Sequence, residues 1–162
     1  EMPRLVACLL LVAVVSASAN VPLLGQAGYI EVNSVHMWYW FFPAEVSQPS
    51  APLLLWLQGG PGASGADGLF YENGPYDGSR PDGEIVRRDN GGDWTKFANC
   101  IFLDQPAGVG FTYSTDKHDY HNINVTYQMS LVDQFLRAFL ETRQPALSTN
   151  PLYIFGESYG GH

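Results

Sequence analysis

The sequence predicts an α/β protein built on a mixed, mostly parallel sheet. Three short apolar runs, at residues 53–57, 100–103 and 152–155, are typical of strands that are buried on both faces of such a sheet. From residue 125 to residue 143, apolar side chains recur at every fourth position, which predicts an amphipathic helix of about five turns. This helix and the strand that follows it form half of a right-handed crossover unit, the usual connection between parallel strands.

Length and charge limit the classes of function. The chain has 162 residues, which is enough for one domain with a hydrophobic core, and 46% of them are hydrophobic. Its formal net charge is −8. We therefore expect no nucleic acid or anionic membrane as partner, because their phosphate groups would be repelled.

The N-terminal residues have the features of a cleaved signal peptide. Arg4 precedes an apolar stretch at residues 5–15, and the small residues that follow contain an A-x-A site ending at Ala19. The stretch is shorter than the roughly 20 apolar residues that a membrane-spanning helix needs. We expect residues 1–19 to be a signal peptide and residues 20–162 to be the mature domain, in the secretory pathway and with no membrane span after cleavage.

Two further features bear on export. Asn124 begins the sequon Asn-Val-Thr, so we expect it to carry a glycan. Cys8 would leave with the signal peptide, and the mature chain would then keep Cys100 alone. That thiol either pairs with a partner elsewhere or, as its place in an apolar run favours, is buried in an interior strand.

The region before the first buried strand predicts a hairpin. Residues 27–32 and 36–42 are rich in β-branched and aromatic side chains and are separated by a short polar turn. Residues 43–52 are predicted to be a loop. Glycine, proline and charged residues are frequent from 67 to 92, which indicates a long irregular excursion with a short strand at 84–88.

The last strand leads directly into Gly156-Glu157-Ser158-Tyr159-Gly160, a G-x-S-x-G motif. After a strand, this motif forms a nucleophile elbow, because the glycines leave room for a sharp turn into a helix. The serine is then held in a strained, exposed turn at the carboxyl edge of the sheet. Ser158 is the candidate nucleophile and the N–H of Tyr159 a candidate oxyanion donor. A solvated Ser-Gly turn is the alternative.

A glycine-rich loop, residues 58–65, follows the strand at 53–57. The bare N–H groups of such a loop can bind a phosphate or an oxyanion. The phosphate-binding loop pattern requires a Gly-Lys-Ser/Thr ending, and this loop contains no lysine. An oxyanion loop with Gly60 as donor fits better, and a flexible surface turn is the remaining alternative.

No metal site and no cofactor are expected. His118 and His121 lie in the polar segment 114–124, and their spacing matches neither a helix pair nor a recognised zinc site. We interpret the apolar stripe of the helix at 125–143 as core packing.

Three blocks of sequence, in this order, resemble the serine carboxypeptidase family of α/β-hydrolases. They are Trp56-Leu57-Gln58-Gly59-Gly60-Pro61-Gly62, Phe102-Leu103-Asp104-Gln105-Pro106-Ala107-Gly108-Val109-Gly110-Phe111 and Gly156-Glu157-Ser158-Tyr159-Gly160-Gly161-His162. The resemblance covers nearly all of the mature chain. It implies the N-terminal part of an α/β-hydrolase fold, an acyl-enzyme on Ser158, an oxyanion hole made by the Gly60 and Tyr159 N–H groups, and peptide or protein C-termini as substrates.

The same resemblance implies a site for the terminal carboxylate of the substrate. The matching positions are Trp56, Gln58, Glu72 and Glu157. A carboxylate that is recognised by carboxyl side chains implies shared protons, and hence a preference for acidic pH. Such chemistry suits a lysosome, a vacuole or an acidic secretion.

The glycine-rich loop departs from the family pattern. Gln58 stands where the family usually has asparagine, so the amide donor is kept on a longer arm. Ala63 and Gly65 replace the usual cysteine and second serine. The disulfide normally anchored at this cysteine cannot form, which bears on the stability of the loop.

The catalytic triad of α/β-hydrolases runs Ser, Asp, His along the chain, and only four residues follow Ser158, ending at His162. His162 is too near in sequence to turn back onto Ser158. We therefore expect an N-terminal portion of a carboxypeptidase, inactive alone, with the acid and base of the triad beyond it. The alternatives are a related plant-type acyltransferase, which transfers the acyl group to an alcohol, and a non-catalytic truncated product.

Overall fold

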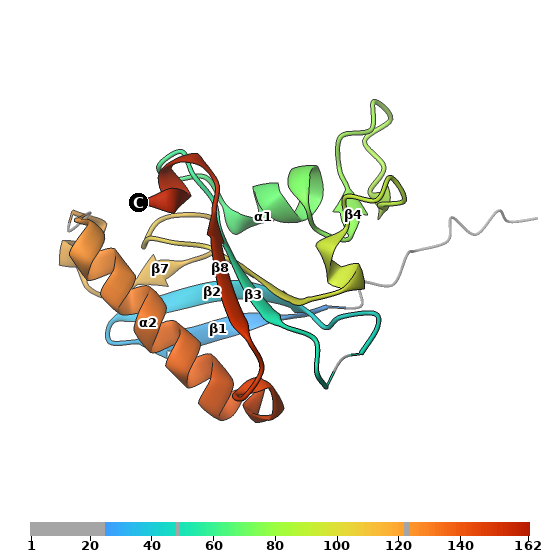
Figure 1. The fold of residues 1–162 in the computed structure, drawn as a ribbon. Helices are drawn as coiled ribbons and strands as arrows, with labels where there is room; N and C mark the ends of the chain where they lie inside the picture. Colours follow the sequence, from blue (N-terminus) through green and yellow to red (C-terminus); the bar gives the residue numbers. More distant parts are fainter. Residues whose placement is uncertain (1–24, 48, 122–123) are drawn as a thin grey trace, which may run out of the picture.

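The computed structural model describes residues 25–47, 49–121 and 124–162 (Figure 1). The predicted signal peptide and its cleavage site lie outside these residues. Within them, a six-stranded sheet has the order β1-β2-β6-β3-β8, and β7 pairs with β2. The α/β class and the mixed sheet predicted from the sequence are confirmed. Within the described residues, however, β3 makes the two parallel pairings and the other three pairings are antiparallel, so the sheet is less parallel than expected.

The antiparallel part of the sheet is the predicted hairpin and its neighbours. β1 (Gln26–Val32) pairs with β2 (Val35–Phe42), and β2 pairs in turn with β6 (Asn99–Leu103) and with the short β7 (Tyr113–Ser114). Alternation of buried and less buried side chains along β2 explains why one face of the hairpin joins the core.

The parallel part brings three strand ends to one edge of the sheet. β3 (Leu53–Leu57) lies between β6 and β8 (Leu152–Gly156) and pairs with both in parallel register, so that Leu57 is opposite Leu103 and Gly156. The carboxyl ends of parallel strands are where open α/β sheets build their sites. The glycine-rich loop, the loop after β6 and the elbow all leave from this edge.

Helix α2 (Val125–Thr142) covers one face of the sheet, as Figure 1 shows. Its buried side chains include Leu131, Phe135 and Phe139, the stripe predicted from the period. The Tyr39 ring meets the rings of Phe135 and Phe139 edge-on, at centroid distances of 5.7 and 5.3 Å. This stripe is core, as predicted.

The ends of α2 agree with the sequence. Asn124 caps the N-terminus, because its Oδ1 accepts a hydrogen bond from the Tyr127 N–H at 2.9 Å. The side chain of Asn124 is exposed. After the helix, Pro145 begins a 3₁₀ turn, Pro145–Leu147, that leads to β8.

The other face of the sheet carries the long excursion between β3 and β6. It contains a short helix α1 (Gly65–Asp67), a π-helical turn (Gly68–Glu72), and a two-stranded sheet of β4 (Tyr76–Asp77) with β5 (Val86–Arg87). A 3₁₀ turn at Trp94–Lys96 lies at the end of the excursion, and two further 3₁₀ turns besides Pro145–Leu147 lie after β6, at Lys117–Tyr120 and Ser158–Gly161. The predicted strand at 84–88 is thus present but shorter, because only two of its residues pair with β4.

Cys100 is an interior thiol, as its apolar run favoured. The residue is 0% exposed, and burial, with a smaller contribution from Asp93, raises the pKa of the thiol to about 12. A thiol with this pKa carries almost no thiolate at neutral pH and is therefore inert.

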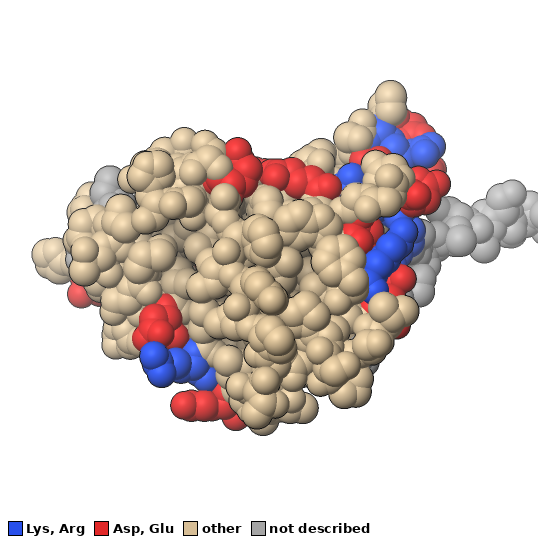
Figure 2. Space-filling model, viewed as in Figure 1, with Lys and Arg blue, Asp and Glu red and all other residues tan. Residues whose placement is uncertain are grey.

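Strand β8 forms one edge of the described sheet, and its side chains are exposed. Leu152, Tyr153, Ile154 and Phe155 are each more than 40% exposed. Figure 2 shows that the central part of this view is almost free of charge, whereas acidic side chains gather along the upper edge, above α1. The chain taken alone therefore presents an apolar sheet edge, a surface that favours self-association.

Candidate active site

Ser158 lies in the strained turn that the motif predicts. Its φ is 50°, in the left-handed region that residues other than glycine seldom adopt. A Cβ at Gly156 would lie 2.1 Å from the Gly160 carbonyl oxygen, and a Cβ at Gly160 would lie 2.2 Å from that of Leu57. Only glycine fits at these two positions, so the elbow geometry follows directly from the sequence.

The glycine-rich loop packs against the elbow. A Cβ at Gly59 would lie 2.8 Å from both the Glu157 carbonyl oxygen and the Ser158 Cβ, so the two backbones are in contact. Gly60 has a φ of 111°, which turns the loop immediately beyond this contact. The loop therefore lies against the elbow, with Gly60 directly after the residue that makes the contact.

A buried carboxylate that sequence reasoning missed anchors the glycine-rich loop. Asp104 is 2% exposed. Its Oδ1 accepts hydrogen bonds from the Ser64 hydroxyl at 2.5 Å and the Gly65 N–H at 2.9 Å, and its Oδ2 accepts one from the Phe111 N–H at 2.8 Å. Asp104 thus joins the loop after β3 to the loop after β6. An acidic residue directly after a buried strand was the available signal.

The four residues matched to carboxylate binding lie together. The Trp56 Nε1–H donates to the Gln58 Oε1 at 2.7 Å, and the Gln58 Nε2–H donates to the Glu72 Oε1 at 2.7 Å. A longer contact of 3.5 Å joins the same Nε2 to the Glu157 Oε2. Two glutamate carboxylates thus converge on one amide group, which is itself largely buried.

The π-helical turn that ends at Glu72 packs tightly on Trp56. A Cβ at Gly68, the first residue of the turn, would lie 2.2 Å from the Trp56 Nε1. There is no room between the turn and the indole, so the position of Glu72 is coupled to that of Trp56. The longer arm of Gln58 spans the remaining gap between the indole and the carboxylate.

A cleft of about 340 Å³ opens beside these groups. It is lined by Gln58, Gly59, Pro61, Gly62, Gln105, Pro106, Ala107, Gly108, Val109, Gln128 and Tyr159. The cleft therefore lies between the glycine-rich loop, the loop after β6 and Tyr159, which is next to Ser158.

In the part of the chain that the structure describes, none of the four histidines is hydrogen-bonded to Ser158. His36 stacks on Tyr113 at 4.5 Å between ring centroids, and His162 stacks on Tyr159 at 4.8 Å. His118 and His121 are exposed. Residues 25–47, 49–121 and 124–162 contain no group of three or more side chains that could hold a metal ion. No helix in the same ranges is long and apolar enough to cross a membrane.

Comparison with known proteins identifies similar chains. The model of a family described as serine carboxypeptidase matches residues 17–162. Serine carboxypeptidase S10 family member 1 of Dictyostelium discoideum is 37% identical over 155 residues, which cover 94% of this chain and 36% of the relative. Carboxypeptidase S1 of Penicillium janthinellum is 39% identical over 137 residues, which cover 84% of this chain and 31% of the relative. This chain thus spans about a third of the length of the curated relatives it matches.

A solved structure gives the same result. The prohormone-processing carboxypeptidase Kex1(delta)p of Saccharomyces cerevisiae has a TM-score of 0.67 and 27% sequence identity, over 83% of this chain and 31% of that chain.

Proposed function

This chain belongs to the serine carboxypeptidase family, and from that premise we propose that residues 20–162 supply the nucleophile, the oxyanion hole and the terminal-carboxylate site of a serine-type carboxypeptidase. The observation that carries the proposal is the hydrogen-bonded group of Trp56, Gln58, Glu72 and Glu157 directly beside the elbow of Ser158. A peptide whose C-terminal carboxylate binds this group has its last amide bond near the serine.

The reaction proceeds through an acyl-enzyme. The Ser158 oxygen attacks the carbonyl carbon of the last peptide bond, and the carbonyl oxygen becomes an oxyanion that accepts hydrogen bonds from the N–H groups of Gly60 and Tyr159. The C–N bond then breaks, the C-terminal residue leaves as an amine with the proton taken from the serine, and water hydrolyses the ester. The strained φ of Ser158 and the contact of Gly59 with the elbow support these assignments.

Carboxylate recognition gives the reaction its pH preference. A substrate carboxylate that enters beside Glu72 and Glu157 is a third carboxyl group in one small site, and repulsion is avoided only when protons are shared between them. The complex then holds more protons than the free enzyme and substrate. Binding therefore weakens as the pH rises, and we propose that the enzyme works at acidic pH in a lysosome, a vacuole or an acidic secretion.

The base and the acid of the triad come from outside residues 1–162. The ring contacts of His36 with Tyr113 and of His162 with Tyr159 support this, because they engage both rings elsewhere. A chain of these 162 residues alone should hydrolyse no peptide, since a serine without its base loses on the order of 10⁴-fold in rate or more. Measurable turnover by the purified 162-residue chain, abolished by Ser158→Ala, would overturn this part of the proposal.

Export is part of the same proposal. We propose that residues 1–19 are removed as a signal peptide and that Asn124 carries a glycan. The exposure of Asn124 supports the second point, and its capping oxygen is not the atom that a glycan modifies. Mass spectrometry of the secreted protein before and after enzymatic deglycosylation, together with N-terminal sequencing, tests both.

The decisive experiment uses the complete protein that carries this sequence. We expect it to release the C-terminal residue from a peptide acid far faster than from the matching peptide amide, and we expect Ser158→Ala to abolish both reactions. Equal rates on the acid and the amide would contradict carboxylate recognition. Transfer of the acyl group to an added alcohol in place of water would instead assign the acyltransferase chemistry, which the paired glutamates disfavour.

A further inference from the structure

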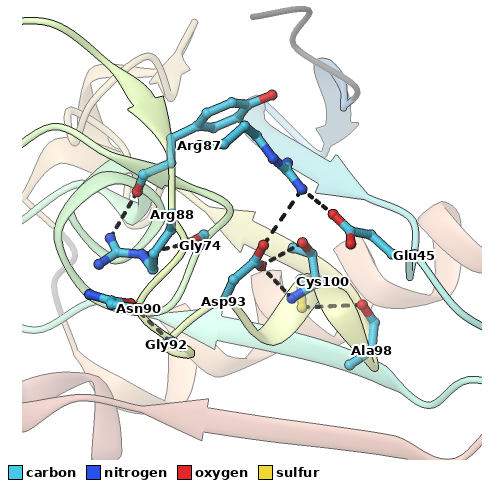
Figure 3. Close-up of polar contacts among 11 residues, drawn as sticks. Glu45, Gly74, Arg87, Arg88, Asn90, Gly92, Asp93, Ala98 and Cys100 are labelled. Atoms are coloured by element: carbon cyan, nitrogen blue, oxygen red, sulfur yellow. Dashed lines mark hydrogen bonds and ion pairs between the residues drawn. The ribbon is translucent and has the colours of Figure 1, made fainter.

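A buried arginine lies behind the π-helical turn that carries Glu72. Arg88 follows β5 and is 8% exposed. Its Nε–H donates to the Gly74 carbonyl at 3.0 Å, and its Nη2 donates to the carbonyls of Phe70 at 3.0 Å and Tyr76 at 2.8 Å. Figure 3 shows Arg88 bonded to Gly74, whereas the side chain of Arg87 reaches toward Glu45 and Asp93.

The three carbonyls bracket Glu72 along the chain. They belong to the residues two before, two after and four after it. The turn itself is closed by N–H donors from Asn73 and Gly74, which both bond to the Gly68 carbonyl. Carbonyls at and after the end of a helical turn have no partner within the turn. Arg88 supplies donors to three of them, and the Phe70 carbonyl also accepts a hydrogen bond from the Gly78 N–H at 3.0 Å. A buried guanidinium is costly unless it is hydrogen-bonded, so the cation and the carbonyls hold one another in place.

We propose that Arg88 is a positioning residue for recognition of the substrate carboxylate, and that it acts through Glu72. The inference rests on the proposed function. Because the turn contacts Trp56 at Gly68 and the Glu72 Oε1 accepts from Gln58 at 2.7 Å, a shift of the turn moves Glu72 relative to both partners. The elbow of Ser158 follows a different strand and meets this group through the longer contact of 3.5 Å between the Gln58 Nε2 and the Glu157 Oε2. Loss of Arg88 therefore weakens binding of a free carboxylate and leaves the chemistry at the serine in place.

The neighbouring arginine has different contacts. Arg87 pairs with Glu45, lies 3.6 Å from the buried Asp93 carboxylate, and stacks over the Tyr76 ring (Figure 3). These contacts fasten the excursion to the rest of the fold. Arg80 touches neither Glu72 nor its turn, since it lies in an exposed turn and pairs with Asp82. Arg80 supplies a control in which a positive charge is lost from the same excursion without a change near Glu72.

The test compares Arg88→Met, Arg88→Lys and Arg80→Met in the complete enzyme. Each is assayed with a peptide acid and the matching amide, and active sites are counted with a serine-directed phosphonate. A small misplacement of a binding group can cost up to 100-fold, so we expect KM for the acid to rise about 10-fold to 100-fold in Arg88→Met. Arg88 bonds the three carbonyls with two nitrogens, whereas lysine has one donor nitrogen. The KM of Arg88→Lys for the acid should therefore lie between those of Arg88→Met and wild type. Arg80→Met should match wild type.

A double-mutant cycle separates positioning from simple folding support. In a Glu72→Gln background, Arg88→Lys should change the ratio of kcat/KM for acid over amide much less than it does in wild type, because the residue through which it acts is already altered. Arg88→Lys remains informative even where Arg88→Met gives no folded protein.

Three results would overturn the inference. The first is an acid-to-amide ratio of kcat/KM that is unchanged in both Arg88 variants. The second is an equal loss of activity on acid and amide that follows a fall in the number of titrated active sites. The third is a double-mutant cycle in which the effects of Arg88→Lys and Glu72→Gln simply add. A wild-type enzyme that does not distinguish the acid from the amide would instead contradict the proposed function itself.

Discussion

Replacing Asp104 by asparagine should loosen the glycine-rich loop, residues 58–65. The carboxylate accepts three hydrogen bonds with two oxygens, from Ser64, Gly65 and Phe111. An asparagine side chain has one oxygen, so its NH₂ group has to face the N–H of either Gly65 or Phe111. One backbone donor, either the buried N–H of Gly65 or the partly buried N–H of Phe111, is then left without an acceptor.

The magnitude follows from these contacts. A buried N–H without a partner costs about 1–3 kcal/mol, and converting the two remaining charge-assisted bonds into neutral ones costs about 1 kcal/mol each. Removal of the buried charge offsets part of this, so we expect a loss of about 2–4 kcal/mol in the free energy of unfolding. Loss of one oxyanion donor lowers kcat by about 100-fold to 1000-fold, and a loosened loop that still carries its donor should cost about tenfold.

Urea unfolding and kcat per titrated active site, both measured on the complete enzyme, test this prediction. Asp82→Asn is the control, since Asp82 is exposed in a turn and touches neither loop. Ser64→Ala removes one of the bonds to Asp104 and the cap that the Ser64 hydroxyl gives to the Ala66 N–H, but it leaves the Gly65 N–H paired with the carboxylate, so its effect should be smaller. An Asp104→Asn enzyme with wild-type stability and wild-type kcat would refute the view that Asp104 holds the loop.

Three further predictions concern titrating groups. Glu157→Gln keeps a donor that no longer titrates, so the kcat/KM of this variant should fall less between acidic and neutral pH than that of wild type; an unchanged pH profile would contradict proton sharing. Burial opposes ionisation of Asp119, but hydrogen bonds from the hydroxyls of Ser114, Ser34 and Tyr127 outweigh it and hold the pKa of this carboxyl below its usual value. The stabilising contribution of the Asp119 carboxylate is therefore present above the pKa of the unfolded carboxyl and is lost as the pH falls through the lower folded value. Asp119→Asn should thus destabilise the protein at neutral pH and have the same stability as wild type in strong acid. Urea unfolding measured across this pH range tests the prediction. Because the pKa of Cys100 is raised to about 12, the native protein should not react with a thiol reagent at pH 8 and should react once unfolded; fast native labelling would show that the thiol is accessible.

Local patterns were sufficient to predict the elements around the site. The continuous apolar runs, the four-residue period of α2 and the glycines around Ser158 each reflect a constraint that acts over a few residues. The resemblance placed Trp56, Gln58, Glu72 and Glu157 in one site, and these four side chains do lie together. Their role in binding a carboxylate stays a prediction.

The supports of the site could not be predicted, because they depend on contacts between residues far apart in the chain. Asp104 and Ser64 are 40 residues apart, and Arg88 lies 18 residues from Phe70. Neither pair has a spacing that indicates contact. The partner strand β4 was also missed, since two paired residues are too few to show a period. Such contacts become evident only once the excursion is folded onto the sheet.

The central claim is that Ser158 carries the acyl group during peptide hydrolysis, and trapping the intermediate tests it most directly. The complete enzyme is mixed with a peptide ester that it turns over, quenched in acid within one turnover, and digested for mass spectrometry. The account predicts an acyl adduct on the fragment that contains Ser158, and its loss in Ser158→Ala. An active enzyme whose adduct lies on another residue, or whose Ser158→Ala variant still turns over the ester at the wild-type rate, would contradict it.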